Sequence, residues 1–168
     1  VGFKGGFFQN DEAHQLEVIR MIRKYQPEIV LSNAIEDRHP DHGRAGNLAY
    51  DACFLSGLAK ISTVDEGIEQ QPWRPRLLFQ YIQDRYIKPD IIIDITPYIE
   101  RKIESIKAFK TQFFNPELDE PDTYISSPEF FESVIARSRE FGKSIGATYA
   151  EGFTSRKLLG VDDLFQLR

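Results

Sequence analysis

The chain has 168 residues, of which 41% are hydrophobic and 28% are charged, and its formal net charge is −5. At this length a single domain can bury ~70% of the surface that its unfolded chain exposes. The negative charge and the lack of a basic run argue against nucleic acid as the main partner, and no apolar stretch approaches the ~18 residues that span a bilayer.

The first half of the chain predicts a helix, a strand and a second helix. Asn10-Asp11 is a suitable N-cap for a helix that runs to about Tyr25, where hydrophobic residues recur at helical spacing. A short apolar strand is predicted over 28–32. The second helix is predicted from about Asp41, with Pro40 at its first position and an alanine-rich apolar face.

The second half continues this alternation. Residues 61–76 are polar and are expected to form a surface loop, whereas the apolar runs at 77–82 and 91–95 are typical of strands buried on both faces. The remaining predicted elements are a helix from Thr96 to near Phe113, a long loop over 115–127, a helix from Ser127 to about Ile145, and a short strand over 149–153. The alternation predicts an α/β domain with a mostly parallel sheet flanked by helices.

The start of the chain suggests that the domain is larger than this sequence. Residues 1–8 are rich in glycine and unpatterned, as a connecting loop inside a domain would be. About three strands are visible, which is few for a sheet covered on both faces. We therefore expect N-terminal strands outside this chain, and we interpret 1–168 as the C-terminal portion of a single domain.

A cluster of chemically active side chains follows the strand predicted at 28–32. It holds two of the three histidines of the chain, and its members are Asp37, Arg38, His39, Asp41, His42 and Arg44. We call residues 36–44 the histidine loop. Open α/β sheets bind ligands beyond the carboxyl ends of their strands, and imidazoles with carboxylates suit a divalent metal with acid–base helpers.

Spacing alone leaves the chemistry of the histidine loop open. A bare His-x-x-His can equally cap a helix or lie in solvent. Catalytic zinc usually has three protein ligands and one water. The loop offers one metal ligand, one further imidazole and a carboxylate, Asp41, that can orient that imidazole.

The other candidates for reactive side chains are His14 and Cys53. His14 lies among polar residues of the first predicted helix, and we expect it to be exposed. Cys53 lies in the second predicted helix without an adjacent basic or histidine partner, which predicts packing rather than nucleophilic chemistry. Because it is the single cysteine, no internal disulfide can form, and a reducing, cytoplasmic setting is predicted.

The segment Arg38-His39-Pro40-Asp41-His42 resembles the second signature of the LmbE-like (PIG-L) zinc deacetylases. The segments that resemble the bacillithiol branch of that family are Gly6–Asp11, Asp51–Leu58, Tyr81–Arg85, Ala150–Phe153 and Leu159–Leu164. Members of this branch remove the acetyl group from N-acetylglucosaminyl malate. The resemblance covers essentially the whole chain. It implies a Rossmann-like, three-layer fold, a zinc-dependent hydrolase acting on an N-acetylglucosamine conjugate, and a homo-oligomer.

The resemblance also implies roles for individual residues. His42 matches the third zinc ligand of the family. His39 matches the non-ligand histidine that stabilises the oxyanion or moves a proton, with Asp41 as its partner, and Arg38 matches a basic residue at the pocket. The first signature of the family, His-Pro-Asp-Asp, supplies the other two ligands and the general base. It does not occur in this chain, so we expect the catalytic site to be incomplete within these residues.

Two further substrate-binding residues are predicted. Arg85 follows the strand run 77–82 and can hold a malyl carboxylate bidentately, although an ion pair with Asp84 or Asp90 is equally compatible with the sequence. Tyr124 lies in a long polar loop and can bring a hydroxyl group to the metal site, with side-chain packing as the alternative.

One alternative function remains open, a non-catalytic fragment or binding module that keeps the fold. A phosphoesterase-like metal site would need more carboxylate ligands than the histidine loop offers. The sequence upstream of Val1 distinguishes enzyme from module, because a strand followed by His-Pro-Asp-Asp would support the enzyme.

Overall fold

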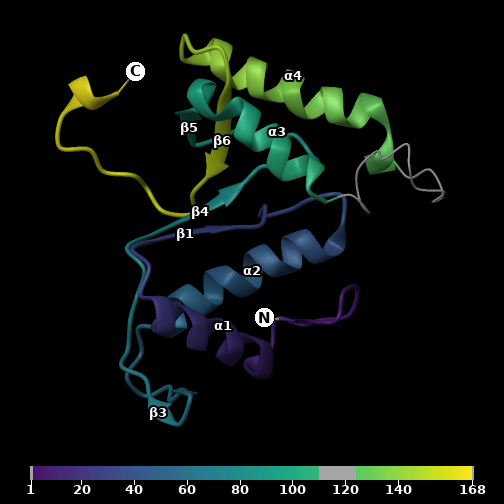
Figure 1. Cartoon of the computed structure of the whole chain (residues 1–168). Helices are drawn as coiled ribbons and strands as arrows, with labels where there is room; N and C mark the ends of the chain where they lie inside the picture. The colour runs from purple at the N-terminus through teal and green to yellow at the C-terminus, as the bar shows by residue number, and fades with distance from the viewer. Residues whose placement is uncertain (1, 110–123, 168) are drawn as a thin grey trace. The chain divides into compact units, whose positions relative to one another are not determined.

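The computed structural model describes residues 2–109 and 124–167 (Figure 1). The chain divides into two compact units, Val1–Ile91 with Phe153–Val161, and Ile92–Gly152 with Asp162–Arg168. The main sheet has the strand order β1-β4-β6-β5 and is flanked by helices. The α/β class predicted from the sequence is therefore confirmed.

The first unit begins with a capped helix and a parallel strand pair. Its elements are α1 (Glu12–Tyr25), β1 (Ile29–Ser32), α2 (Pro40–Leu55), β2 (Val64–Asp65), β3 (Ile68–Glu69) and β4 (Leu77–Tyr81). As predicted, Asp11 caps α1 by accepting the backbone N–H of His14. β1 and β4 run parallel, with Ile29 opposite Leu77, so their carboxyl ends lie at the same edge of the sheet.

The segment predicted to be a plain surface loop contains a small hairpin. β2 and β3 pair antiparallel, with Asp65 opposite Ile68. The two residues between them, Glu66 and Gly67, have φ values of 52° and 82°. Two-residue hairpin turns of type I′ require positive φ at both central positions. The sequence prediction missed the hairpin because Glu-Gly is a weaker turn signal than Asn-Gly or Asp-Gly.

The later elements agree with the predicted order but not with every boundary. They are β5 (Ile91–Asp94), the 3-10 helix η1 (Thr96–Tyr98), α3 (Ile99–Lys107), η2 (Tyr124–Ser126), α4 (Pro128–Ser144), β6 (Ala150–Thr154) and η3 (Leu164–Gln166). Ser127 caps α4 through the N–H of Phe130, as predicted. The predicted helix end near Phe113 and most of the loop 115–127 lie outside the described residues, and α3 ends at Lys107.

The strands add one detail to the prediction and correct one expectation. β6 runs antiparallel to β4, with Thr154 opposite Gln80, which the predicted mostly parallel sheet allows. β5 is not buried on both faces, because Ile93 is 46% exposed. A continuous apolar run predicts a strand but cannot show how many of its faces are covered.

The core of the first unit lies between its two helices. Ile19 and Ile22 of α1 contact Ala52 and Cys53 of α2. The partly buried residues packed around them are Leu16, Val18, Val30, Leu55, Ile61, Trp73 and Leu78. Complete burial of one such isoleucine contributes roughly 1.5–3 kcal/mol. This packing fixes α2, and with it the histidine loop from which α2 starts.

Gly46 allows α2 to approach the segment that follows β1. A Cβ atom at Gly46 would lie 2.6 Å from the carbonyl oxygen of Ala34, 2.8 Å from that of Asn33 and 2.6 Å from Nε2 of Gln80. Gln80 is completely buried, and its amide donates to the Asn33 carbonyl at 3.1 Å. Glycine at this position therefore sets how closely the helix lies against the end of β1.

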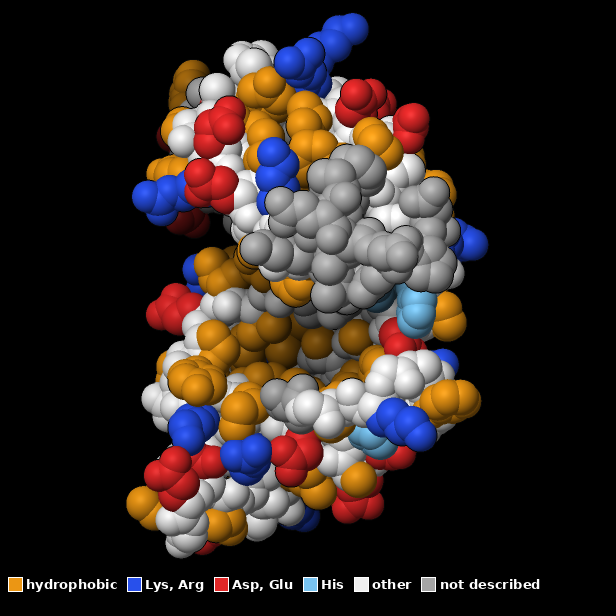
Figure 2. Space-filling model, turned by 45° about the vertical axis from the view of Figure 1, so that its right-hand side comes forward, with side chains coloured by type: hydrophobic (Ala, Val, Ile, Leu, Met, Phe, Trp, Pro, Cys, Tyr) orange, Lys and Arg blue, Asp and Glu red, His pale blue; other side chains and the backbone are white. Residues whose placement is uncertain are grey.

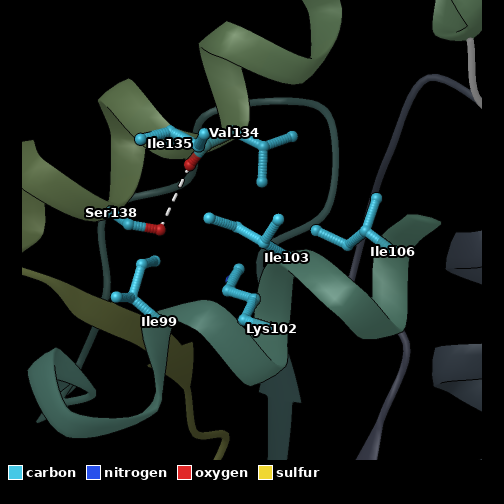
Figure 3. A pocket seen from close by; sticks show the side chains of 7 residues that line it. All are labelled: Ile99, Lys102, Ile103, Ile106, Val134, Ile135 and Ser138. Atoms are coloured by element: carbon cyan, nitrogen blue, oxygen red, sulfur yellow. Dashed lines mark hydrogen bonds between the residues drawn. The ribbon is translucent and has the colours of Figure 1, made fainter.

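In the second unit, α3 and α4 pack through aliphatic side chains (Figure 3). The residues that line the contact are Ile99, Lys102, Ile103, Ile106, Val134, Ile135 and Ser138. They leave no room for a water molecule. Ser138 donates to the carbonyl of Val134 at 3.1 Å within its own helix. This contact is hydrophobic packing rather than a ligand cavity.

The surface in view carries charges of both signs. Acidic and basic side chains are interspersed over this face (Figure 2). Across 2–109 and 124–167, no helix has the length and apolar character that crossing a membrane requires.

Candidate functional site

The candidate site lies where β1 and β4 end. The histidine loop follows β1, and the β4 loop, residues 82–85, follows β4. Side chains hold the β4 loop against this edge: the Gln83 side-chain oxygen accepts from the amide of Asn33, just after β1, at 3.0 Å, and the Arg38 guanidinium of the histidine loop donates to Asp84 at 2.7 Å. The parallel pairing of β1 with β4 therefore places the predicted residues of both loops at one edge of the sheet.

Asp37 is the buried centre of this edge, since its side chain has no exposed surface. Its Oδ1 accepts the backbone N–H groups of Asp84 at 3.0 Å and Arg85 at 2.8 Å, and its Oδ2 lies 2.5 Å from Nδ1 of His42. Burial acts to raise the pKa of Asp37. The hydrogen bonds from Arg85, His42, Arg38 and Asp84 outweigh burial and hold the pKa of Asp37 below its ordinary value. The group is therefore a carboxylate at neutral pH.

His42 takes its tautomer from this carboxylate. An ionised carboxylate accepts hydrogen bonds and donates none, so the proton of neutral His42 lies on Nδ1 and the lone pair on Nε2. The side chain of His42 is 34% exposed, so the ring is not enclosed by the protein. Metal-binding histidines commonly donate their other ring N–H to a carboxylate in this way.

His39 has the opposite arrangement. It is the N-cap of α2, and its Nδ1 accepts the backbone N–H of Asp41 at 3.2 Å. Its proton therefore lies on Nε2, which is a donor. The ring centroids of His39 and His42 are 5.4 Å apart. One edge of the sheet thus presents an imidazole acceptor from His42 and an imidazole donor from His39.

The carboxylate of Asp41 binds neighbours other than His39. Its Oδ1 accepts from Arg44 at 2.6 Å, and its Oδ2 accepts the backbone N–H of Gly6 at 2.5 Å. Oδ2 lies 4.0 Å from Nδ1 of His39, beyond hydrogen-bond distance. The contact between Asp41 and His39 therefore consists of the backbone hydrogen bond and a nearby negative charge.

The two predicted basic residues differ in how they are held. Both are exposed, but Arg38 pairs through its side chain with Asp84, whereas Arg85 is fixed through its backbone N–H on Asp37. The carboxylates that the sequence offered as ion-pair partners of Arg85 have other contacts. Asp84 binds Arg38, and Asp90 accepts the N–H of Ser155 at 2.8 Å.

Tyr124 belongs to the second unit, in η2, where its ring packs against Phe130 with the centroids 5.2 Å apart. Side-chain packing was the alternative that the sequence left open for this residue. Its predicted role in substrate binding stays a prediction.

His14 is less exposed than the sequence predicted, and the prediction for Cys53 is confirmed. The side chain of His14 is 25% exposed, its Nδ1 lies 2.6 Å from Asp11, and its ring meets Phe3 edge-on at 4.7 Å. It lies at the start of α1, where the cap and the preceding segment cover it. Cys53 is buried in the core between α1 and α2.

Among the described residues, no group of three or more His, Cys, Asp or Glu side chains is arranged to hold a metal ion. His42, with an available Nε2 and a carboxylate on Nδ1, fits one coordination position. The donor set is thus compatible with a metal to which other ligands contribute.

Sequence interpretation counted Asp37 among the charged neighbours of the histidines and missed its role. An aspartate five positions before a histidine is no signal by itself. The contact arises because the first turn of α2 lies close to the segment before it, as Gly43 shows, where a Cβ would lie 3.3 Å from the Ile35 carbonyl oxygen. The two N–H groups that hold Asp37 come from residues more than forty positions away, Asp84 and Arg85.

Comparison with known proteins places this edge in context. No protein-family model matches the chain. The chain is 29% identical over 139 residues to the diacetylchitobiose deacetylase of Thermococcus kodakarensis, a match that covers 81% of this chain and 48% of that protein. The chain therefore spans about half the length of this relative.

Solved structures share the fold. The conserved protein TT1542 from Thermus thermophilus has a TM-score of 0.80 and 28% identity, covering 96% of this chain and 66% of that one. The N,N'-diacetylchitobiose deacetylase from Pyrococcus horikoshii has a TM-score of 0.70 and 24% identity, covering 90% of this chain and 54% of that one. The chain has the fold of a diacetylchitobiose deacetylase. Together with the sequence match, this supports the LmbE-like superfamily expected from the histidine loop.

The same fold also occurs in an enzyme of another class. GalB, the 4-carboxy-2-hydroxymuconate hydratase from Pseudomonas putida KT2440, has a TM-score of 0.68 and 19% identity, covering 92% of this chain and 62% of that one. The fold alone therefore does not select the reaction, which must be argued from the side chains at the site.

Proposed function

We propose that the chain carries part of a zinc-dependent N-deacetylase that removes the acetyl group from an N-acetylglucosamine conjugate. The single observation that carries this proposal is the pair of opposite tautomers, an acceptor Nε2 on His42 and a donor Nε2–H on His39, at the carboxyl ends of β1 and β4. Similarity to a protein that acts as a diacetylchitobiose deacetylase supports an N-acetylated sugar as the substrate class.

The roles of the chain's own groups follow from these tautomers. His42 would hold the metal through Nε2, with Asp37 fixing its ring. When bound, the metal supplies Lewis acidity, lowering the pKa of water and polarising the acetyl carbonyl. The Nε2–H of His39 would donate to the oxygen that becomes negative in the tetrahedral intermediate, the position where a donor contributes most. Asp41 would keep a negative charge 4.0 Å from that ring.

Recognition of the conjugate would fall to the basic residues of the same edge. Arg85 exposes a guanidinium group whose backbone is fixed by Asp37, and a guanidinium binds a carboxylate through two parallel hydrogen bonds. Together with Arg38, which pairs with the neighbouring Asp84, this favours an acidic conjugate such as the N-acetylglucosaminyl malate of bacillithiol biosynthesis. A cytoplasmic location and a homo-oligomer belong to the same proposal.

A non-catalytic binding module is the second candidate. The observation that favours it is the lack of a three-ligand group within the part of the chain that the structure describes. In that case the histidine loop would still present one imidazole donor and one acceptor, and it would bind a ligand without turning it over.

The test uses the full-length protein and measures zinc content and acetate release from N-acetylglucosaminyl malate and from diacetylchitobiose. His42→Ala should lose zinc and activity together. His39→Ala should keep zinc and lower kcat by roughly 10²–10³, the effect of removing an oxyanion donor. His14→Ala is the matched control, because His14 contacts Asp11 and Phe3 instead of the histidine loop, and it should change neither quantity.

Full zinc occupancy in the His42→Ala protein would contradict the ligand assignment. Wild-type protein that binds either sugar without releasing acetate would support the binding module. Release of acetate from diacetylchitobiose alone would support the deacetylase activity and refute the proposal of an acidic conjugate as substrate.

A further inference from the structure

We infer that Asp37 is a positioning residue that selects the metal-binding tautomer of His42, and that the backbone of the β4 loop imposes the orientation of Asp37. The inference rests on the proposed role of His42 as a metal ligand. The tautomer itself can be measured without any assay of function.

The carboxylate of Asp37 is held at both oxygens. Two successive backbone N–H groups, from Asp84 and Arg85, point at Oδ1, which leaves Oδ2 for Nδ1 of His42. The side chain has no exposed surface, so water cannot replace any of these partners without a local rearrangement. The β4 loop thus determines which way His42 turns, although no side chain of that loop needs to contact the ring.

Free neutral histidine favours the proton on Nε2. In that form the nitrogen that would bind a metal has no lone pair. Asp37 reverses this preference, because its ionised Oδ2 lies 2.5 Å from Nδ1 and can only accept a hydrogen bond there, which requires the proton on Nδ1. The function that we assign to Asp37 is therefore a choice between two states of one ring, which differs from simply stabilising the loop.

An asparagine at this position would make the opposite choice. Its amide oxygen would have to face the two N–H groups of the β4 loop, because an NH₂ group there would oppose two donors in a buried place. The NH₂ group would then face His42, whose Nδ1 would accept and whose proton would move to Nε2. Asp37→Asn keeps the size and the packing of the side chain but would block the metal-binding nitrogen.

Asp84→Asn is the matched control. Asp84 lies in the β4 loop and undergoes the same chemical change, but its carboxylate binds Arg38, and its contact with Asp37 runs through the backbone N–H, which the substitution keeps. A purely structural role of the β4 loop would affect both variants alike, whereas tautomer selection affects Asp37→Asn alone.

The experiment records long-range ¹H–¹⁵N correlations of the histidine rings in metal-free, ¹⁵N-histidine-labelled full-length protein, about two pH units above the ordinary histidine pKa of ~6.5. His42 should carry its proton on Nδ1 in wild type and in Asp84→Asn, and on Nε2 in Asp37→Asn. His39, bonded to the N–H of Asp41, should show Nε2–H in all three proteins and serves as the internal reference.

A second readout is the affinity for added Zn²⁺, which should fall by roughly 10–100-fold in Asp37→Asn, as is usual when the partner of a ligating histidine is removed. It should stay unchanged in Asp84→Asn. A proton on Nε2 of His42 in wild type, or on Nδ1 in Asp37→Asn, would overturn the inference. If Asp37→Asn does not fold, the wild-type tautomer decides. Absence of deacetylase activity together with the expected tautomers would refute the proposed function and leave this inference intact.

Discussion

Two buried charged side chains of the first unit, Arg23 and Asp37, are both held by backbone groups, yet they serve different ends. Arg23 is 3% exposed and the Asp37 side chain is fully covered. α2 connects the two places, because it starts in the histidine loop and ends at Leu55, just before the carbonyl groups that Arg23 binds. Arg23 holds the segment that follows the C-terminus of α2, and Asp37 orients the ring of His42 near the N-terminus of α2.

All the polar contacts of Arg23 stabilise the fold. Its guanidinium donates to the carbonyl oxygens of Ser56 at 3.0 Å, Leu58 at 2.9 Å and Ile61 at 2.7 Å, and to the hydroxyl of Thr63 at 2.9 Å. These acceptors follow the C-terminus of α2, where backbone carbonyls lack helical partners. The planar fork of arginine can reach several such oxygens at once.

Asp37 differs in its last partner. Its backbone partners include the N–H groups of Asp84 and Arg85, but its side-chain partner is His42, whose ring is one-third exposed. The backbone N–H groups that fix Asp37 therefore also fix the ring of His42, which a ligand can reach. A buried charge such as Arg23, which binds only groups of the fold, stabilises the structure. A buried charge such as Asp37, which also binds a partly exposed ring, orients that ring for a ligand.

The largest expected effect on stability is that of Arg23→Ala. Each hydrogen bond from a charged group contributes about 1.5–3 kcal/mol, so loss of four should lower the free energy of unfolding by ~3 kcal/mol or more even after water enters. Urea unfolding measures the change. The tautomer of His42 should be unchanged in the folded variant. A decrease in the free energy of unfolding below ~1 kcal/mol, the contribution of one ordinary neutral hydrogen bond, would contradict the stabilising role of Arg23.

A smaller decrease in the free energy of unfolding is expected from Gly46→Ala, which tests the packing between α2 and the end of β1. The added methyl group would lie 2.6 Å from the Ala34 carbonyl oxygen, and backbone cannot move away as a flexible side chain can. Overpacking of this kind costs about 1–3 kcal/mol. Gly160→Ala is the control, since nothing lies within 4 Å of its added Cβ. Equal melting temperatures for both variants would refute the close approach.

The smallest effect concerns Cys53, which shares the core with the Arg23 region. Burial raises the pKa of the Cys53 thiol to about 12. Because the folded state keeps this proton to higher pH than the unfolded chain, its contribution to stability is complete below the ordinary thiol pKa and is lost as the pH rises toward 12. Near the ordinary thiol pKa of ~8.5, a thiol reagent should label the native protein far more slowly than the urea-unfolded chain.

Labelling of Cys53 also sharpens the comparison between the two regions. Arg23→Ala should speed the reaction, because it loosens the segment beyond α2, whereas Asp84→Asn should leave the rate unchanged. Native protein that reacts as fast as unfolded protein would contradict the burial of this thiol in the core.

Local sequence determined the elements that local chemistry can specify. The caps at Asp11 and Ser127 and the helix start at Pro40 were predictable, because each depends on residues within one helical turn. The position of the histidine loop beyond β1 was predictable for the same reason, since an apolar strand and a helix start enclose it. What the residue types could do chemically also followed from the sequence.

Tertiary structure alone decided the contacts that join distant segments. The antiparallel direction of β6, the approach of α2 at Gly46 and the four acceptors of Arg23 each depend on residues far apart in the chain. The tautomer of His42 belongs to this class, because the N–H groups that orient Asp37 lie beyond β4. Sequence spacing specifies which groups are available, but a proton takes its place on one ring nitrogen according to the acceptor that folding brings to it.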